Sequence, residues 1–489
     1  MFGIDVNAAA FAPALVLLIV AAMATLWSLF EADGRFMAML ALIGVVMSGL
    51  FNVQLLLEGN ASGTYLSSFG LKYLADAPAI GFNFVILIGT ALAVLIAYDY
   101  LGRTDLDHPE YYPLILLSSC GAMVMAAAGD LITLILGLEI MSLAVYVLSA
   151  WRQNARESEE AGMKYFLLGA FASAFLIYGI ALMYGATGSF SYGSIAAALQ
   201  ADGFSNVFYA SLGGMMILAG LGFKVAFAPF HQWAPDVYTG APTSVTAFMS
   251  VVVKAAAFAA LLRIASSFFT ELPPVLNQVL VVLIVLTLVI GNLGALLQQG
   301  LKRMLAYSAV AHAGYLGLAV LAAGTTGTKA AVWYLTAYAL MNAGAFAVLS
   351  LMTDRNDHGD ALERFAGLGR TRPGLAAALS IFLLSLAGIP LLAGFVGKIL
   401  VFQAAISAGY VGLAVLGILT SIVAVVYYIR PIAYMYFRDS EYKAPEIKSR
   451  ATSIAIGLAV IGTIGLGIFP GWWYGLINAG KSIMAMAGL

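Results

Sequence analysis

The chain has 489 residues, 62% of them hydrophobic and only 10% charged, and its formal net charge is -1. Soluble globular domains carry far more charge, so the composition predicts a polytopic membrane protein and excludes a basic surface for nucleic acid. The single cysteine, Cys120, excludes an internal disulfide, and four histidines without ligand spacing give no reason to expect a metal, haem or Fe–S site in this chain.

Apolar segments of membrane length follow one another along the whole chain. A transmembrane helix needs about 20 apolar residues, and lipid forces each crossing segment to satisfy its own backbone hydrogen bonds. The predicted fold class is therefore an all-α polytopic bundle without a soluble domain. Its fourteen predicted spans lie near residues 10–30, 36–57, 78–99, 112–128, 131–150, 162–185, 207–230, 242–264, 275–298, 303–323, 328–352, 375–406, 410–436 and 451–478.

Predicted spans seven and twelve are both interrupted. Pro229 follows Lys224 in the first, and Pro390 precedes Lys398 in the second. Proline removes a backbone donor and bends or breaks a helix. One interrupted span in each half is typical of transporters built from inverted repeats, although a proline kink alone is also common. The predicted regions are a three-helix N-terminal segment (1–110), a first five-helix repeat (111–270), a second, inverted repeat (271–438) and a C-terminal helix (439–489).

The distribution of Lys and Arg between the two sides predicts the orientation. With an even number of spans, sixteen of these residues fall on one side and four on the other. Cytoplasmic loops of membrane proteins are enriched in Lys and Arg. Both termini are therefore expected on the side away from the cytoplasm.

Four ionisable side chains stand inside apolar spans: Glu139, Lys224, Lys254 and Lys398. A charge at bilayer depth is costly and persists mainly where it pairs, lines a polar cavity, or carries ions or protons. Burial disfavours a protonated lysine and a nearby carboxylate favours it, so Glu139 could switch Lys224 between holding and donating a proton. The alternative for Lys224 and Lys398 is that their ammonium groups reach toward the membrane surface.

Two further polar residues have competing interpretations. His312 falls in the middle of span ten, where histidine either relays protons or makes a structural hydrogen bond to a neighbouring helix. Asp130, directly before span five, is predicted to be a helix N-cap rather than a functional carboxylate.

Several stretches resemble a known family. They are AGMKYFLLGAFASA at 161–174, FAPFHQWAPDVY at 227–238, KRMLAYS at 302–308 and LEIMSLAVYVL at 138–148. Together they resemble the antiporter-like subunits of bacterial proton-translocating NADH:quinone oxidoreductase, respiratory complex I, and most of all the N type. The central stretches are shared with the L and M types and with multi-subunit cation/proton antiporters. The N type is indicated by the span-five stretch, by the absence of a long lateral extension, and by lysine rather than glutamate at Lys398.

The resemblance implies both a function and roles for individual residues. Glu139 and Lys224 would form a pair within direct or single-water contact, Lys254 would be the central relay, and Lys398 would communicate with the far side. The chain would translocate protons in the bacterial cytoplasmic (inner) membrane without redox chemistry of its own. Flavin, Fe–S clusters and quinone are expected in partner subunits, and subunits of the K and M types, with lipid, are expected as neighbours.

Two alternatives remain open from the sequence. The chain could serve in a multi-subunit cation/proton antiporter or a membrane-bound hydrogenase, which would use the same buried charges. It could also be a structural membrane spacer, whose charges only hold helices together.

Overall fold

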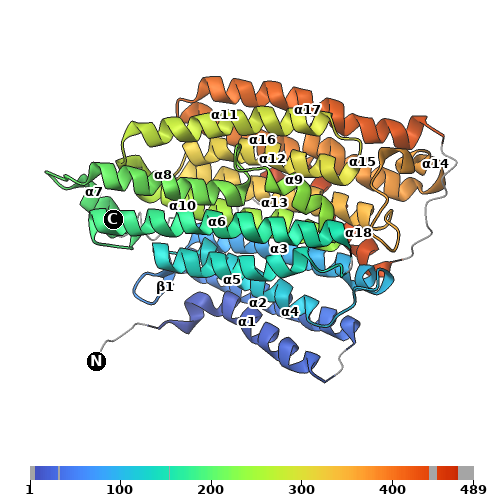
Figure 1. Cartoon of the computed structure of the whole chain (residues 1–489), viewed down its shortest axis with the longest axis horizontal. Helices are drawn as coiled ribbons and strands as arrows, with labels where there is room; N and C mark the ends of the chain where they lie inside the picture. The colour runs from blue at the N-terminus through green and yellow to red at the C-terminus, as the bar shows by residue number, and fades with distance from the viewer. Residues whose placement is uncertain (1–5, 31–32, 154, 440–448, 472–489) are drawn as a thin grey trace.

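The computed structural model describes residues 6–30, 33–153, 155–439 and 449–471, most of which lie in helices (Figure 1). The elements of the first half are α1 (Ala8–Ser28), α2 (Gly34–Ser62), β1 (Leu66–Ser68), β2 (Tyr73–Ala75), α3 (Ala77–Arg103), α4 (Tyr111–Ala126), α5 (Leu131–Ser149), α6 (Arg156–Thr187), α7 (Tyr192–Gln200), α8 (Val207–Val225) and α9 (Trp233–Gly240). The elements of the second half are α10 (Thr243–Ser267), η1 (Phe269–Glu271), α11 (Pro274–Leu296), α12 (Leu301–Leu321), α13 (Thr325–Ser350), η2 (Leu362–Phe365), α14 (Leu368–Thr371), α15 (Pro373–Ala387), α16 (Ala393–Ser407), α17 (Val411–Phe437) and α18 (Arg450–Ile468).

Among the described residues, 12 helices are long and apolar enough to cross a membrane, which confirms the all-α polytopic fold class. Two of the fourteen predicted spans are not in that set. Span four corresponds to the 16-residue helix α4, and span twelve is divided between α15 and α16. The count of fourteen, the region boundaries and the inverted relation of the repeats stay predictions. Positions 472–478 of span fourteen lie outside the described residues. So do Lys443, Lys448 and Lys481, which are among the Lys and Arg residues counted on the two sides of the membrane.

The first predicted break lies directly after Lys224. Helix α8 ends at Val225, and Ala226 takes a left-handed conformation with φ of 63° while its N–H caps the carbonyls of the last turn. Pro229 cannot donate a backbone hydrogen bond, so the helix does not continue. Span seven therefore ends at Val225, five residues before the predicted boundary at 230. The chain becomes helical again at Trp233, where α9 begins.

The second break separates α15 from α16. Helix α15 ends at Ala387 and is capped by Gly388, with φ of 89°, and α16 begins at Ala393. The Ser385 hydroxyl accepts a hydrogen bond from the Gly394 N–H at 3.0 Å and so holds the two helix ends together. Lys398 lies in the second turn of α16, where its side chain can reach back to the open end of α15.

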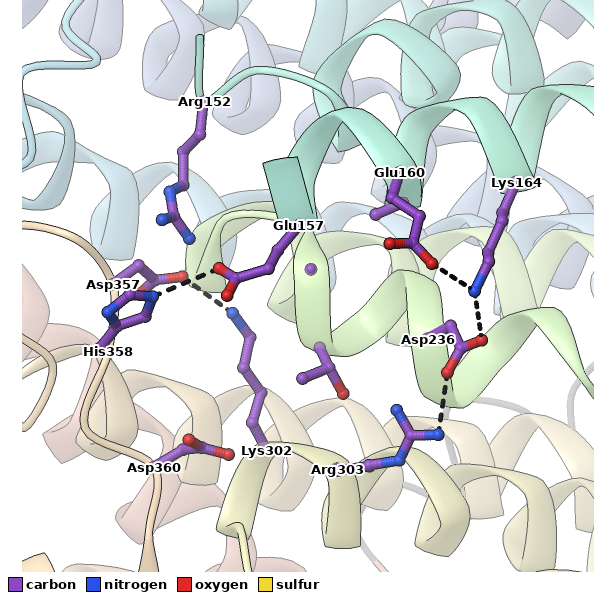
Figure 2. Close-up of a pocket in the computed structure, with 13 residues that line it drawn as sticks. Arg152, Glu157, Glu160, Lys164, Asp236, Lys302, Arg303, Asp357, His358 and Asp360 are labelled. Atoms are coloured by element: carbon purple, nitrogen blue, oxygen red, sulfur yellow. Dashed lines mark hydrogen bonds and ion pairs between the residues drawn. The ribbon is translucent and has the colours of Figure 1, made fainter. Parts of the chain in front are cut away.

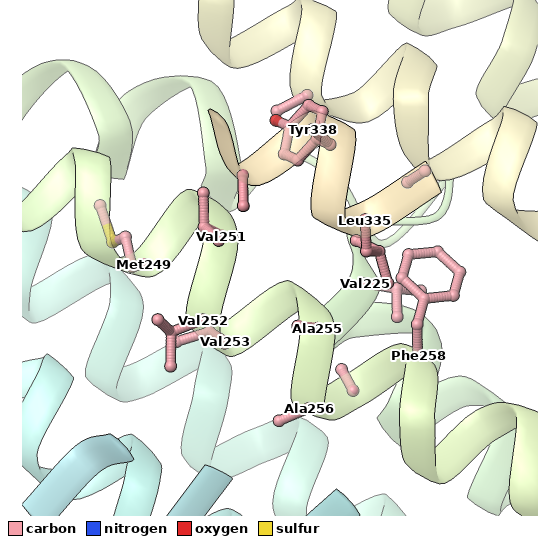
Figure 3. Packing of buried hydrophobic residues seen from close by; sticks show 14 of the residues in the cluster. Val225, Met249, Val251, Val252, Val253, Ala255, Ala256, Phe258, Leu335 and Tyr338 are labelled. Atoms are coloured by element: carbon pink, nitrogen blue, oxygen red, sulfur yellow. The ribbon is translucent and has the colours of Figure 1, made fainter. Parts of the chain in front are cut away.

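Helix α10 is the centre of the bundle. Its most apolar stretch is fully buried, and it packs against α3, α4, α5, α8, α12 and α13. Figure 3 shows the apolar side chains around it, among them Val251, Val252 and Phe258. Lys254 therefore projects from the helix with the least access to lipid.

Polar contacts fix the two ends of the bundle. The hairpin β1–β2 and α7 lie at one end and α14 at the other (Figure 1). At the hairpin end, both terminal nitrogens of Arg263 donate to Asp76 at 2.8 Å, and Asp76 also caps α3. The predicted N-cap is confirmed, because Asp130 accepts a hydrogen bond from the Thr133 N–H at 2.6 Å.

Candidate functional site

Aromatic rings enclose Lys224 at the end of α8. Lys224 is 2% exposed, and its Nζ donates to the Tyr146 hydroxyl at 3.1 Å. The same nitrogen lies 5.0 Å from the centre of the Tyr146 ring and 5.1 Å from that of Tyr165. Such cation–π contacts contribute about 2 kcal/mol when desolvated, whereas burying an ammonium costs several times as much. The ammonium group is thus held in position without being neutralised.

Glu139 lies on α5, two turns before Tyr146. Its carboxylate accepts a hydrogen bond from the Ser173 hydroxyl of α6 at 2.7 Å, and the residue is half-buried. Ser142 is buried on the same face of α5, because spacings of three and seven residues align along a helix. Helix α5 therefore presents a continuous polar stripe from Glu139 to the hydroxyl that holds Lys224.

Of the two kinds of contact expected between Glu139 and Lys224, direct or through a single water, the structure shows no direct one. Neither residue takes part in an ion pair within 4.0 Å among the residues described. Each group is hydrogen-bonded to another side chain instead: the Glu139 carboxylate to Ser173 and the Lys224 ammonium to Tyr146. Contact through a single water stays a prediction.

Lys254 projects from α10 toward α12 and α13. It is 2% exposed, and its Nζ donates to the backbone carbonyl of Ala309. The same nitrogen lies 5.4 Å from the centre of the Tyr338 ring. No carboxylate oxygen of the described residues lies within 4.0 Å of it. The position is too deep for the ammonium to reach the membrane surface.

His312 lies one turn beyond Ala309 on α12 and makes two hydrogen bonds to tyrosines of other helices. Its Nδ1 is 2.6 Å from the Tyr334 hydroxyl, and its Nε2 is 3.1 Å from the Tyr428 hydroxyl. Tyr428 also hydrogen-bonds to Ser308. The imidazole is 1% exposed, and its ring lies 5.7 Å from that of Tyr315, which faces Lys398. It therefore occupies a polar cluster between the two lysines.

Lys398 fills the break between α15 and α16. Its Nζ donates to the Ala387 carbonyl at 2.8 Å and to the Ser421 hydroxyl of α17 at 2.7 Å. The ammonium lies 5.1 Å from the centre of the Tyr315 ring, which itself lies 5.7 Å from the His312 ring. The residue is 4% exposed, so the side chain is not turned toward lipid.

Polar side chains lie between Lys254 and Lys398, whereas apolar side chains pack beside Lys224. Between Lys254 and Lys398 stand the imidazole and the tyrosine hydroxyls just described. On the Lys224 side, Val225, Phe258 and Leu335 pack together as part of the apolar core (Figure 3). The structure thus brings Lys254, His312 and Lys398 into one polar cluster and leaves Lys224 and Glu139 in a second one.

The partners of these groups were not identified from the sequence. They are Tyr146 and Ser173 in the first cluster, and Tyr334, Tyr428 and Ser421 in the second. The seven-residue spacing from Glu139 is a signal that could have singled out Tyr146. The other four come from helices whose contacts no local pattern specifies. Within the described part of the chain, no three His, Cys, Asp or Glu side chains form a group that could hold a metal ion.

Comparisons with known proteins agree on one family. Residues 128–424 match the family model described as NADH:quinone oxidoreductase/Mrp antiporter, TM. NADH-quinone oxidoreductase subunit N of Trichlorobacter lovleyi is 44% identical over 437 residues, which are 89% of this chain and 88% of that protein.

Two solved structures share the fold of this chain. A chain of respiratory complex I from Thermus thermophilus has a TM-score of 0.81 and 36% identity, with 96% of this chain and all of that chain covered. A chain of the Mrp complex from Dietzia has a TM-score of 0.83 at 20% identity, with 97% of each chain covered, and shares the fold.

Proposed function

This chain belongs to the NADH-quinone oxidoreductase subunit N family, the antiporter-like membrane subunits of respiratory complex I, and we propose that it carries protons across the membrane through its buried ionisable groups. The groups are Glu139, Lys224, Lys254, His312 and Lys398. Proton movement would be coupled to NADH:quinone oxidoreduction in other subunits of the complex.

One observation carries this proposal: three lysines are buried in the bundle without a carboxylate partner among the described residues. Their exposed fractions are 2%, 2% and 4%, and within that part of the chain their donors meet hydroxyls, backbone carbonyls and ring faces. A structural lysine at such depth is normally paired, because an unpaired buried charge is costly. A group that must release and regain a proton gains from weak partners, since neither protonation state is locked.

The arrangement supports a stepwise transfer. A proton held on the Lys224 ammonium would pass to a neutral Lys254 amine when the apolar contact between the clusters admits water. It would then move through His312, which accepts at one ring nitrogen and donates from the other, to Lys398. The charge of Glu139 would bias the first step, because moving the carboxylate toward Lys224 favours the ammonium form.

The remaining parts of the proposal concern the rest of the complex. The chain would hold no cofactor and carry no electrons, with flavin, Fe–S clusters and quinone in partner subunits. Its neighbours in the membrane would be subunits of the K and M types. Both termini would face away from the cytoplasm of a bacterial inner membrane, as the Lys and Arg distribution predicts.

Replacing Lys254 with alanine in the intact complex tests the proposal. The expected result is an assembled enzyme with reduced NADH:quinone turnover and fewer protons moved per electron pair in sealed vesicles. The matched control is Lys72→Ala, because Lys72 is exposed in the β1–β2 turn. Unchanged proton stoichiometry in assembled Lys254→Ala complex would instead establish the spacer interpretation.

A further inference from the structure

Ion pairs fix the chain that follows the first break, around a polar cavity of about 290 Å³ (Figure 2). Lys164 and Arg303 each lie 2.8 Å from the Asp236 carboxylate of α9. Lys302 Nζ lies 2.8 Å from the Asp357 carboxylate, with side chains 3% and 0% exposed. Asp357 also accepts two hydrogen bonds from the first residue of α10. Charged side chains therefore hold α9 and the start of α10 in place.

The break in span twelve has no comparable set of charges. Residues 385–398 include the ends of both half-helices and the loop 388–392 between them, and their one charged side chain is that of Lys398 itself. The hydrogen bond between Ser385 and Gly394 joins the two helix ends. The shape of the loop must therefore come mainly from packing.

One end of this loop contacts Lys398. Gly388 lies directly beside the lysine, because a Cβ at this position would be 3.0 Å from the Cδ of Lys398 and 3.2 Å from its Nζ. The ammonium donates to the carbonyl of Ala387, the residue before the loop, at 2.8 Å. A shift of the loop relative to α16 would therefore change the distance between the ammonium and its acceptor.

The other end of the loop is covered by α18. Gly467 packs on the backbone of two loop residues, and a Cβ at Gly467 would overlap the Leu391 carbonyl oxygen and come within 2.6 Å of the Leu392 Cα. Ordinary contacts of a Cβ begin at 3.4 Å, so any other residue would force α18 and the loop apart by about 0.8 Å, the difference between these distances. Glycine is the residue that permits so close an approach of two backbones.

Leu391 indicates that the loop needs external support. Its φ is 72°, in the left-handed region that residues with a Cβ rarely adopt, and its side chain is 72% exposed. A side chain that exposed gains little from packing, so it does not hold its own backbone in this conformation. Strained conformations persist where the surrounding structure imposes them. The contact of the Leu391 carbonyl with α18 is such a constraint.

Helix α18 is itself fixed near both ends. At its start, the Ser449 hydroxyl caps the helix and donates to the Asp99 carboxylate of α3 at 2.7 Å. Near its end, Leu466 packs in an apolar cluster with Trp333 of α13 and Ala393, the first residue of α16. Helix α18 therefore connects α3 and α13 to the loop.

We propose that α18 positions Lys398, with Gly467 as the residue that lets the helix hold the loop in the shape required. The inference rests on the proposed function of Lys398. Gly467 carries no proton and acts through the loop, whose other end sets the distance from the ammonium to the Ala387 carbonyl. A displacement of about 1 Å in a reacting group can slow a reaction by about 100-fold. The position of α18 therefore controls the rate at which Lys398 exchanges its proton.

The test is Gly467→Ala in the intact complex, measured as NADH:quinone turnover and protons moved per electron pair in sealed vesicles. We expect kcat to fall roughly tenfold, with fewer protons moved per electron pair. KM for NADH and quinone should stay unchanged, because both would bind in other subunits. The matched controls are Gly457→Ala and Gly465→Ala on the same helix, where a Cβ meets no described atom within 4 Å. Both controls should keep wild-type turnover.

A second substitution separates positioning from a general loss of packing. Leu391→Gly relieves the left-handed strain and lets the loop give way locally, so the double variant Gly467→Ala/Leu391→Gly should regain most of the lost turnover. If Gly467→Ala does not assemble, Leu466→Ala replaces it, because this change loosens the contact of α18 with the start of α16 without adding an atom. Turnover of the assembled Leu466→Ala complex should then be reduced, and a wild-type rate would refute the inference.

The outcomes that overturn this inference differ from failure of the proposed function. Full turnover and proton stoichiometry in Gly467→Ala, together with slow turnover in Lys398→Ala, refute the positioning role and leave the proton path intact. A slow Gly467→Ala complex that Leu391→Gly does not restore assigns Gly467 a packing role only. If Lys398→Ala also moves protons at the normal stoichiometry and rate, the proposed function of Lys398 itself fails.

Discussion

Replacing Lys302 with methionine should destabilise the complex, whereas the same change at Lys254 should leave its stability nearly unchanged. Lys302→Met leaves the Asp357 carboxylate buried without its cation, and breaking a buried pair in this way costs about 3–5 kcal/mol. Lys254→Met removes a charge-assisted hydrogen bond to a carbonyl, worth about 1.5–3 kcal/mol, and a cation–π contact of about 2 kcal/mol. It also removes a desolvation cost of several kcal/mol for the buried ammonium. The net change in stability for Lys254→Met should therefore lie near zero.

The assay is heat challenge of the purified complex. We expect Lys302→Met to lower the temperature at which half of the complex stays assembled, whereas Lys254→Met should keep the wild-type temperature but lose turnover. Lys72→Met, at an exposed turn position, is the control for both. If Lys254→Met lowers this temperature as much as Lys302→Met does, then Lys254 stabilises the fold. That result would refute the inference that a buried lysine without a carboxylate partner serves proton transfer.

Three further predictions follow from the contacts described. Tyr146→Phe keeps the ring that faces Lys224 but removes its hydroxyl, so turnover should fall severalfold with assembly unchanged; a normal rate of NADH oxidation would contradict a role for the hydroxyl. Glu139→Gln should reduce the number of protons moved per electron pair in sealed vesicles while the complex assembles at normal yield, because no carboxylate then favours the ammonium form of Lys224. An unchanged proton stoichiometry would refute this. Burial raises the pKa of Asp357, but Lys302 and the hydrogen bonds of Thr243 outweigh it and hold the pKa below its usual value. A lowered pKa in the folded state stabilises the fold above the unfolded pKa of about 3.9 and loses that contribution as the pH falls below it. The stability difference between wild type and Asp357→Asn, followed by heat challenge from pH 7 to 3, should therefore be constant above about pH 5 and shrink in acid; a difference that grows in acid would contradict the assignment.

The features that the sequence predicted well are those set by local chemistry. A proline and a change of backbone conformation end α8 after Lys224 and α15 before Lys398, and both breaks could be located from Pro229 and Pro390 alone. Asp130 capped its helix as its position indicated. Apolar length was enough to predict the all-α polytopic fold, and twelve of the predicted spans correspond to helices of membrane length among the described residues, because lipid leaves a crossing backbone no choice except to form a helix.

The features that the sequence did not predict are choices between equivalent partners. Glu139 could have bound Lys224 directly, yet it binds Ser173, and Lys224 binds Tyr146. With 24 tyrosines in the chain, composition gives no means of selecting Tyr334 as the partner of His312. These choices depend on how α5, α6 and α8 cross, and on how α12 and α13 meet, which is tertiary information.

The five most deeply buried Lys and Arg residues of the described chain divide into two kinds according to their partners. Arg263 at one end and Lys302 at the other each bind a buried carboxylate, with Asp76 and Asp357 as partners, and these pairs hold the ends of α3 and α10. The lysines between them have none among the described residues. A protein that needed charges only to lock helices would pair them throughout, because each unpaired cation raises the free energy of the fold. Pairing at the ends and its absence at the centre is the distribution expected if the end charges stabilise the bundle and the central ones change their protonation state.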